Sequence, residues 1–512
     1  MCKPEDNGCP VYLAQGTLRI GRQLKGIHLI RDINLLEAIS HATHERIPER
    51  FVHAKGAGAY GTFKVTNADF IKKYTDADFL NTQGKKTPLF ARFSTVVGER
   101  GSADSVRDTR GFAFKIYTQD GNLDWLFFST PTFPIRDGGK FPSLIHAQKR
   151  DPETGLRNPT TFWEYAPPAR FKPDALNQLT IYDSFMSRNP ETFNTIMSVF
   201  SDRGTPQNYR HSDIYSINTS ATPQEPPTEE FVYVRIHLRT NQKIANLSQK
   251  DAEQLAGADP DAYTRDLYNS IKTGDFPSWD VRAQIVKHED ADSFPVNIFD
   301  PTKTWPKNKA PWTKFGTITL NQNPNDYFEE VEQVSFSPAA VVPGWDISPD
   351  PILQTRLFAY GSAARYRLGI NFHQLPVNTV RSPQGAYNPT KRDGAGYINQ
   401  YNPKIQPNYF PADGAPVRPA AVRVLAADQD TWSGSVAAFE STVTDQDWKQ
   451  PRKVWNAFSE KEKAVFVSNV ALSLGGAKQT VRDLTYDCFG KIASDLEERI
   501  RRAIGDMDDG TT

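Results

Sequence analysis

An arginine and a tyrosine four residues apart are the residues of this chain that could do the least common chemistry. Helical spacing between Arg356 and Tyr360 would place both side chains on one face. A guanidinium beside a phenol stabilises the phenolate through its charge and through hydrogen bonding. Tyrosinate is a ligand of haem iron, although a rare one, so this pair could hold a buried metal. The same spacing also occurs between ordinary neighbours on a helix surface.

A histidine ahead of a glycine-rich segment is the second candidate. His53 precedes Gly56, Gly58 and Gly61, where the backbone can approach a ligand closely. A histidine that faces a haem from its open side can take a proton from peroxide and return it to the leaving oxygen. Considered alone, His53 is better interpreted as a hydrogen-bonded structural histidine than as a catalyst, because the chain has 9 histidines and most of them must have ordinary roles.

The segments that contain these residues resemble the signatures of monofunctional haem catalases. Residues 46–61 resemble the distal-histidine signature, and residues 356–360 resemble the proximal-tyrosine signature. Further catalase-like segments occur in catalase order at residues 89–96, 107–117, 135–137, 200–204 and 371–378. The resemblance covers nearly the whole chain and implies a catalase fold with haem b as cofactor.

The resemblance implies a catalytic pair and an iron ligand. His53 would be the distal acid/base, and Ser94 would orient it through a hydrogen bond. Tyr360 would ligate the haem iron, with Arg356 holding it as tyrosinate.

Other matching residues would surround the haem. Val52 would lie over its distal face, while Phe133 and Phe141 would line the distal side and the channel. The arginines that match those pairing with the haem propionates are Arg50, Arg92 and Arg367. A guanidinium binds a carboxylate bidentately, although a surface ion pair is the default interpretation of each arginine alone.

One distal position departs from the family pattern. Family members carry an asparagine there, and an ungapped match anchored on residues 130–131 and 135–137 places Phe128 at that position. A phenyl ring cannot donate the hydrogen bond that orients peroxide, and such a bond supplies several kcal/mol of transition-state stabilisation. The departure predicts weakened peroxide dismutation and a pocket suited to an organic substrate. In the alternative, Ser129 or a water molecule replaces the missing amide and dismutation persists.

An outer NADPH site of some catalases is partly retained. Ser201, Arg203, Arg239 and Trp305 match or substitute plausibly for the residues of that site. Asn194 and Lys307 stand where the family usually has histidine, and the same polar residues could equally be surface groups. Residues 361–367 also depart from the family pattern after Tyr360, which removes hydrogen-bonding groups near the haem edge.

The composition limits the kinds of partner. Equal numbers of Lys+Arg and Asp+Glu, 60 of each, give no overall field for nucleic acid or an acidic membrane. The 3 cysteines form neither a disulfide framework nor a zinc site. We expect a small-molecule substrate with peroxide or superoxide, a homodimer or homotetramer, and a cytosolic location, since no signal core or Ser-Lys-Leu-type address is found.

Local patterns predict the elements that position these residues. Alternation at residues 112–117, the Asp120-Gly121 turn and residues 122–128 predict a hairpin, and residues 231–238 predict another strand. Helices are expected at 32–44, after a Ser459–Glu462 capping box, and from Leu484 to Ile504.

The expected fold class is α+β, a catalase fold built on an antiparallel eight-stranded β-barrel. We expect four parts: an N-terminal arm (1–48), a haem-binding barrel domain (49–305), a wrapping segment with the tyrosine helix (306–422) and a C-terminal helical domain (423–512). The function predicted first is a haem-dependent oxidoreductase repurposed to oxidise an organic molecule, such as an oxidative cyclisation of the chanoclavine synthase type in alkaloid biosynthesis. The alternatives are an authentic catalase and a non-catalytic haem carrier or sensor.

Overall fold

The structure is a computed structural model of the 512-residue chain. It describes residues 3–4, 8, 10–11, 17–20, 27–28, 31–157, 159–165, 189–216, 218–223, 231–381, 391–398, 409 and 442–508. Residues 382–390, 399–408 and 410–422 of the predicted wrapping segment, and the start of the predicted C-terminal domain, lie outside these residues. Cys2, Cys9 and the last four residues also lie outside them.

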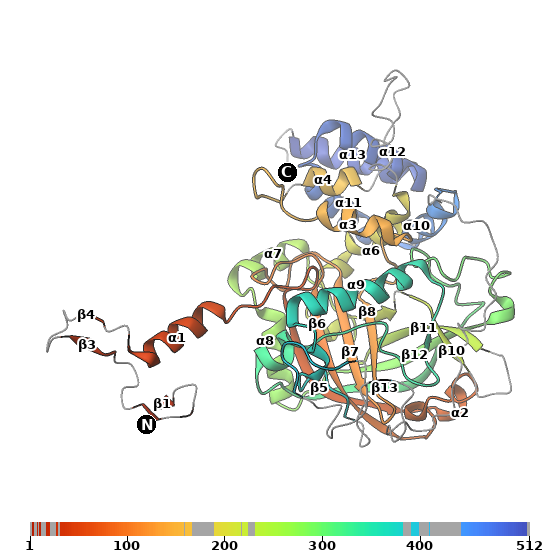
Figure 1. Cartoon of the computed structure of the whole chain (residues 1–512). Coiled ribbons are helices and arrows are strands. Elements are labelled where there is room, and N and C mark those ends of the chain that lie inside the picture. Colours follow the sequence, from red (N-terminus) through yellow and green to blue (C-terminus); the bar gives the residue numbers. More distant parts are fainter. Residues whose placement is uncertain are drawn as a thin grey trace.

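Eight antiparallel strands close into a barrel at the centre of the molecule (Figure 1). They pair in the order β12-β13-β5-β6-β7-β8-β9-β11, and pairing of β11 with β12 completes the ring. The predicted antiparallel eight-stranded barrel is therefore confirmed. Its strands are β5 (Gly56–Val65), β6 (Lys86–Thr95), β7 (Arg110–Tyr117), β8 (Asn122–Phe128), β9 (Ile214–Ser216), β11 (Phe231–Thr240), β12 (Ser278–Lys287) and β13 (Thr313–Gln322). Two short strands, β10 (Ser220–Pro223) and β14 (Asp346–Ile347), extend the sheet beside β11.

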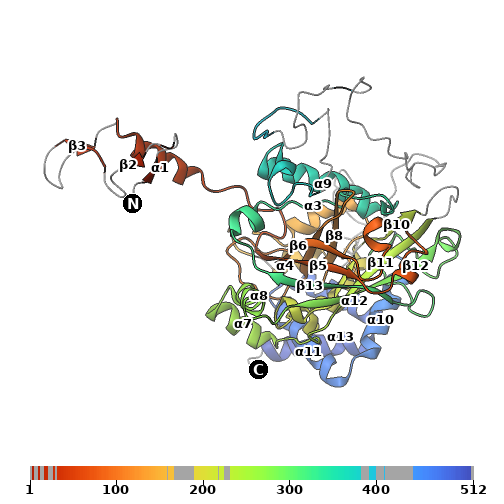
Figure 2. The ribbon, with the colours of Figure 1, turned by 90° about the horizontal axis from the view of Figure 1, so that it is seen from below.

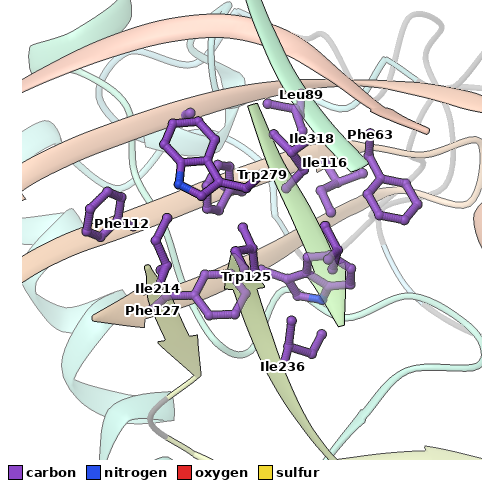
Figure 3. Packing of buried hydrophobic residues seen from close by; sticks show 14 of the residues in the cluster. Phe63, Leu89, Phe112, Ile116, Trp125, Phe127, Ile214, Ile236, Trp279 and Ile318 are labelled. Carbon is purple, nitrogen blue, oxygen red and sulfur yellow. The ribbon is translucent and has the colours of Figure 1, made fainter. Parts of the chain in front are cut away.

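Alternate residues of the strands fill the barrel with apolar side chains (Figure 3). Phe112, Phe114 and Ile116 of β7 point inward with exposed fractions of 1% or less, as their period-2 spacing requires. The predicted hairpin is confirmed, because β7 and β8 pair antiparallel and Gly121 at the turn has φ 136°. A packed interior leaves no room for a cofactor inside the barrel, so the site must lie outside it.

The N-terminal segment carries the helix α1 (Ile33–His44), which lies away from the barrel (Figures 1 and 2). The Asp32 side chain caps this helix, and none of its residues is buried. Four two-residue strands precede it: β1 (Lys3–Pro4), β2 (Pro10–Val11), β3 (Arg19–Ile20) and β4 (Ile27–His28).

Helices cover the outside of the barrel. The long helix α9 (Pro351–Leu368) runs across one end of it, above β6 to β8 in Figure 1. The shorter helices are α2 (Ala68–Ile71), α3 (Phe141–His146), α7 (Gln249–Ala258) and α8 (Ala262–Lys272), together with a π-helical turn, η7 (Phe328–Glu332). None of the helices in the described ranges is long and apolar enough to cross a lipid bilayer.

A second hydrophobic core forms beside the barrel from helices of two sequence regions. It joins α4 (Pro159–Tyr165) and α6 (Phe193–Val199) to α10 (Gln446–Ala457), α11 (Glu460–Leu474), α12 (Gln479–Ile492) and α13 (Ser494–Asp508). The predicted capping box is present, since the Ser459 and Glu462 side chains bond each other's backbone N–H groups. The amphipathic stretch predicted from Leu484 to Ile504 is helical, but in two elements, because extended backbone at Ala493 (φ −161°) separates α12 from α13.

The structure also corrects the predicted end of the barrel domain at residue 305. Strand β13 (Thr313–Gln322) pairs with β12 and β5 and so belongs to the barrel. Register shifts on both of its edges interrupt the alternation by which a strand is found in sequence. The four-part division of the chain stays a prediction with this strand moved into the barrel.

Candidate functional site

His53 lies in the chain entering β5, where tertiary contacts hold its backbone in an unusual conformation. Its φ is 65°, which is uncommon for a residue other than glycine and marks a position held by its surroundings. The N–H of His53 donates to the Val96 carbonyl at 2.9 Å, and the Arg92 guanidinium donates to the His53 carbonyl at 2.8 Å. These contacts fix the direction in which the imidazole ring leaves the chain.

The imidazole ring is oriented by Ser94 and by a neighbouring glycine. Ser94 Oγ lies 2.9 Å from His53 Nδ1, and Gly111 faces Ser94 across the β6–β7 pair. A Cβ atom at Gly111 would lie 2.4 Å from the His53 ring and 2.9 Å from Ser94 Oγ. With Nδ1 engaged by Ser94, Nε2 is the ring atom left to meet a ligand.

His53 is neutral at ordinary pH. Burial, followed by the charges of Arg92, Arg356 and Arg50, lowers its pKa from 6.5 to about 3. A neutral imidazole can accept a proton, as an acid/base at this position requires.

Phe128 lies against the same ring, at the end of β8. The centroids of its ring and the His53 imidazole are 5.7 Å apart, and Phe133 stacks on Phe128 at 5.8 Å. Ser129 does not take the place of the missing amide. Its Oγ accepts the N–H of Arg110 at 2.9 Å, and Ser129 is not among the residues that line the cavity.

Tyr360 and Arg356 lie together on α9, as the spacing predicts. An Arg356 N–H donates to the Tyr360 oxygen at 2.9 Å, and the guanidinium lies 5.0 Å from the centre of the phenol ring. Arg356 also donates to the Asn218 side-chain oxygen, and Asn218 donates to Asp350 at 2.8 Å. Asp350 caps α9 by accepting the N–H groups of Ile352 and Leu353. One hydrogen-bonded series therefore links the start of the helix to the phenol.

Three buried or nearly buried arginines converge at the rim of the site. Arg50 donates to the carbonyls of Val331 (3.0 Å), Glu332 (2.9 Å) and Val334 (2.9 Å), and Arg367 donates to Glu332 and Val334. Burial, then the charges of Arg92 and Arg367, hold the pKa of Arg50 well below its usual value.

This cluster has more positive charge than its protein partners offset. The Glu332 carboxylate pairs closely with Arg100, at 3.0 Å. Its distance to Arg50 is longer, 3.9 Å, so it offsets the charge of Arg50 less well. Arg92 Nε is buried without a hydrogen-bond partner among the described residues. Buried cations of this kind require anions, and two carboxylate groups of a ligand would supply them.

The histidine, the phenol and the three rim arginines line a single cavity of about 840 Å³. His53 and Tyr360 both reach it, so an acid/base and a phenol share one space. The predicted distal, proximal and rim residues that line it are His53, Ser94, Phe128, Arg50, Val52, Arg92, Phe133, Phe141, Arg356, Tyr360 and Arg367. The volume, the apolar walls and the unbalanced arginines fit a flat, apolar macrocycle bearing carboxylates, as haem is.

The residues predicted for NADPH lie elsewhere. Ser201 and Arg203 adjoin on a 3-10 turn, Arg239 is exposed at the end of β11, and Trp305 is buried 4.9 Å from the Arg235 guanidinium. None of these four residues lines the cavity.

Of the two predicted substitutions, Lys307 is exposed, and Asn194 is buried and donates to the Thr302 carbonyl at 2.8 Å and to Gln450 at 2.9 Å. Asn194 is therefore satisfied within the protein, and NADPH binding stays a prediction.

Sequence reasoning missed Gly111, Asn218, Asp350 and Glu332. The sequence Ser348-Pro349-Asp350-Pro351 is an N-cap followed by proline, which could have identified the start of α9. A glycine inside an alternating strand, such as Gly111, indicates a close approach by another group. Asn218 and Glu332 carry no local signal, because their importance arises from contacts more than 30 residues away along the chain.

The fold and the site define a class of protein: a β-barrel enzyme with a haem-sized cavity between a histidine and a tyrosine. The family model described as Catalase matches residues 4–415, and Catalase-related immune-responsive matches residues 441–504. This chain belongs to the catalase family, whose enzymes bind haem, and it is a haem oxidoreductase.

Individual relatives agree with this assignment. The chain is 48% identical to Catalase A of Botryotinia fuckeliana, over 91% of this chain and 92% of the relative. It is 40% identical to a peroxisomal catalase of Candida albicans, over 97% of each chain. The solved structure of catalase A from Saccharomyces cerevisiae superposes with a TM-score of 0.90 at 36% identity, covering 98% of this chain and 99% of that one.

These relatives correct the expected cytosolic location. The relatives from Candida albicans and Pichia angusta are named peroxisomal catalases, which points away from the cytosol. The cytosolic expectation depended on finding no Ser-Lys-Leu-type address. Such an address is read by a receptor, so the physical chemistry of the fold does not reveal the compartment.

Proposed function

We propose that the cavity holds haem b, with its iron bound by Tyr360 and its open face toward His53. Arg356 would hold the phenol as tyrosinate, since its N–H already meets the phenol oxygen. The propionates would bind Arg50, Arg92 and Arg367, whose excess charge supports this orientation. Val52 and Phe133 would lie on the distal side, and Phe141 would line the access channel.

His53 would act on hydrogen peroxide. When bound, haem supplies an iron centre that takes up the two oxidising equivalents released when the O–O bond breaks. His53 Nε2 accepts the proton of one peroxide oxygen and returns it to the other, which leaves as water. Ser94 keeps the ring in the orientation required for both transfers through its contact with Nδ1.

The second half of the reaction is where Phe128 makes the difference. Dismutation uses a second peroxide as reductant, so two peroxides give one dioxygen and two waters. The apolar ring beside His53 offers that peroxide no hydrogen bond. We infer that an organic molecule supplies the two electrons and two protons instead, so that one peroxide gives two waters and the oxidised molecule. The lining carries nothing specific to an alkaloid or to ring closure, and the proposed class is therefore an organic reductant in general.

An authentic catalase is the second candidate function. It is favoured by the retained His53–Ser94 and Arg356–Tyr360 contacts and by 48% identity to a protein named Catalase A. The two functions share a cofactor and the proton transfers of His53, and they differ in the molecule that supplies the two electrons: a second peroxide or an organic reductant.

Oxygen evolution from the haem-loaded protein distinguishes the two. We expect slow evolution of dioxygen from hydrogen peroxide, and a rise of about tenfold or more in Phe128→Asn, because a distal donor contributes about 10²–10³ in rate. Phe276→Asn, at a position that is 42% exposed and outside the cavity, serves as the control and should leave the rate unchanged. Vigorous evolution by the unmodified protein, with no gain in Phe128→Asn, would establish the authentic catalase.

We also propose a homo-oligomer, a dimer or a tetramer. Enzymes of this family typically form homotetramers. The helix α1 supports an assembly, because it buries none of its residues against its own chain and exposes Ile33, Leu36 and Ile39.

A further inference from the structure

A buried tyrosine with a carboxylate partner lies inside the barrel, behind the wall that faces the cavity. Tyr209 is 1% exposed, and its O–H donates to Asp104 Oδ1 at 3.2 Å. Asp104 is also buried, in the loop before β7, and its second oxygen accepts the N–H of Thr264 at 3.0 Å. Neither Tyr209 nor Asp104 has a role in the reaction of His53 with peroxide. A phenol bonded to a carboxylate can lose an electron and a proton together.

Two contacts between aromatic rings connect Tyr209 to the cavity. Phe112 borders the cavity, and its ring meets Phe93 edge-on with the centroids 5.1 Å apart. Phe93 in turn stacks on Tyr209 at 5.4 Å with 24° between the ring planes. Phe93 also precedes Ser94, the residue that contacts His53 in the cavity. Packed rings in direct contact give an electron a short path through the barrel wall.

Two other oxidisable rings of the same core, Trp279 and Tyr263, lack a proton acceptor of this kind. The Trp279 N–H donates to the Ser212 carbonyl at 3.0 Å. The Tyr263 O–H donates to the Pro206 carbonyl. A backbone carbonyl does not hold a proton at ordinary pH, whereas a carboxylate can. Of the three rings, Tyr209 is therefore the one that can be oxidised without leaving a positive charge in the core.

The protonation of the pair favours the same transfer. Burial, followed by the charge of Asp104, raises the pKa of Tyr209 well above its usual value, so the phenol keeps its proton until it is oxidised. Burial also raises the pKa of Asp104, although the Thr264 N–H and the charge of Lys55 oppose this shift. A carboxylate whose pKa is raised is a stronger proton acceptor.

We propose that Tyr209 is a redox-active tyrosine that gives one electron to the peroxide-oxidised haem centre and its phenolic proton to Asp104. The inference goes beyond the proposed function, but it rests on the haem and the peroxide of that proposal. Tyr209 supplies the electron when no organic reductant is in the cavity. The oxidising equivalent is then held on one buried ring and does not attack the side chains that line the cavity.

The step balances in electrons and protons. The O–H bond of Tyr209 breaks, which leaves a neutral phenoxyl radical, and Asp104 becomes a neutral carboxylic acid. One of the two oxidising equivalents of a peroxide molecule is consumed, and the other remains at the haem. An organic reductant that later returns one electron, together with the proton held by Asp104, restores the phenol.

Electron paramagnetic resonance of the haem-loaded, full-length protein tests the proposal. The protein is mixed with hydrogen peroxide, without an organic reductant, and rapidly frozen. We expect a tyrosyl radical signal whose hyperfine splitting collapses when the protein contains ring-deuterated tyrosine. Tyr209→Phe keeps the stacked ring and should lose the signal. Asp104→Asn keeps an oxygen beside the phenol but cannot take up its proton, so the radical should form about 10²-fold more slowly. Tyr486→Phe, at an equally buried tyrosine of the helical body, is the matched control and should keep the signal.

A full tyrosyl signal in Tyr209→Phe would overturn the proposal, and so would a radical that forms equally fast in Asp104→Asn. Absence of any tyrosyl signal from the unmodified protein while it consumes peroxide would also overturn it, whether or not the variants retain haem. The outcome is separable from the proposed function. Slow dioxygen evolution without a tyrosyl signal would remove the redox role of Tyr209 and leave the proposed function. Vigorous evolution with a tyrosyl signal that is lost in Tyr209→Phe would do the reverse.

Discussion

At the scale of the residue, the properties of the site come from what lies beside each side chain. His53 is neutral because it is buried and surrounded by three arginines, and it is oriented because Ser94 and the Val96 carbonyl hold it. Phe128 places an apolar ring, which has no hydrogen-bond donor, next to the imidazole. The position opposite Ser94 matters equally, since only glycine fits there.

Replacing this glycine by alanine disturbs the orientation of the His53 ring while keeping the side chain, so the effect of orientation is measured by itself. In Gly111→Ala the new methyl group would meet the His53 ring and Ser94 Oγ, so the ring must move. We expect the rate of peroxide consumption to fall about 10²-fold, because a shift of about 1 Å in a catalytic group has an effect of that size. The haem absorption band should be retained. Gly101→Ala, where a Cβ meets nothing within 4 Å, is the matched control and should keep full activity.

Single residues were predictable where a motif contains them. The eleven residues assigned from the distal, proximal and rim signatures line one cavity, although they are spread from position 50 to position 367 of the sequence. Asn218 was not predictable, because it acts through Arg356 and Asp350, which are more than 130 residues away. Ser129, an open alternative from sequence, is excluded as the distal donor because it does not line the cavity.

At the scale of the element, α9 sets the position of the phenol. Its first turn is fixed by Asp350, and one turn further on Arg356 is tied to the same carboxylate through Asn218. Burial raises the pKa of Asp350, and the contacts from Asn218 and from backbone N–H groups oppose this shift. Because α9 is held at its N-terminus, the Tyr360 side chain keeps a fixed position in the cavity wall.

Removing the Asp350 side chain should loosen this helix. We expect Asp350→Ala to lower the free energy of unfolding by about 2 kcal/mol, the upper range for a lost cap, because Asn218 also loses a buried partner. The haem spectrum should shift as Arg356 and Tyr360 move, and Asn218→Ala should give the same shift with a smaller loss of stability. Asp445→Ala is the control, since Asp445 stands at the N-cap of α10 without a side-chain cap bond. An unshifted spectrum in both site variants would refute the link.

Elements were predictable where their signals are local. The β7–β8 hairpin, β11 and the capping box of α11 each follow from neighbouring residues. Strand β13 was missed because its pairing shifts register on both edges, and tertiary pairing with β5 and β12 maintains it. The break between α12 and α13 was missed because Ala493 is no helix breaker by type.

At the scale of the whole molecule, two packed bodies meet at a buried group of charges. Asp447 on α10 accepts from Arg136 at 2.7 and 3.2 Å and from Lys303 at 2.7 Å. Asp300 lies 3.2 Å from the same arginine. Arg136 follows β8 and Lys303 follows β12, two strands of the barrel, whereas Asp447 belongs to the helical body. The Asp447 carboxylate therefore connects the barrel to the helical body.

The connection should weaken in acid. Burial favours the neutral form of Asp447, but the hydrogen bond from Arg136 and the charge of Lys303 outweigh it and lower the pKa from 3.8 to about 2. A carboxyl group whose pKa is lower in the folded protein than in the unfolded chain stabilises the fold at every pH above its unfolded-state pKa. This stabilisation is lost as the pH falls from about 4 to 2. We expect Asp447→Asn to cost about 3 kcal/mol at pH 6, because it removes the carboxylate charge that Arg136 and Lys303 share.

Denaturant unfolding at pH 6 and pH 3 measures the pH-dependent part of this cost. The unmodified protein and Asp447→Asn should differ in free energy of unfolding by about 1 kcal/mol less at pH 3 than at pH 6. The reason is that this share of the stabilisation by the ionised Asp447 carboxylate is lost by pH 3. The control is Asp445→Asn, two residues away on the solvent side, whose carboxylate is 64% exposed and meets only Arg452 at 3.2 Å among the described residues. The free energy of unfolding of Asp445→Asn should differ little from that of the unmodified protein at either pH. A cost for Asp447→Asn that stays constant from pH 6 to pH 3 would show that the carboxylate acts by shape and hydrogen bonding and that its charge does not join the two bodies.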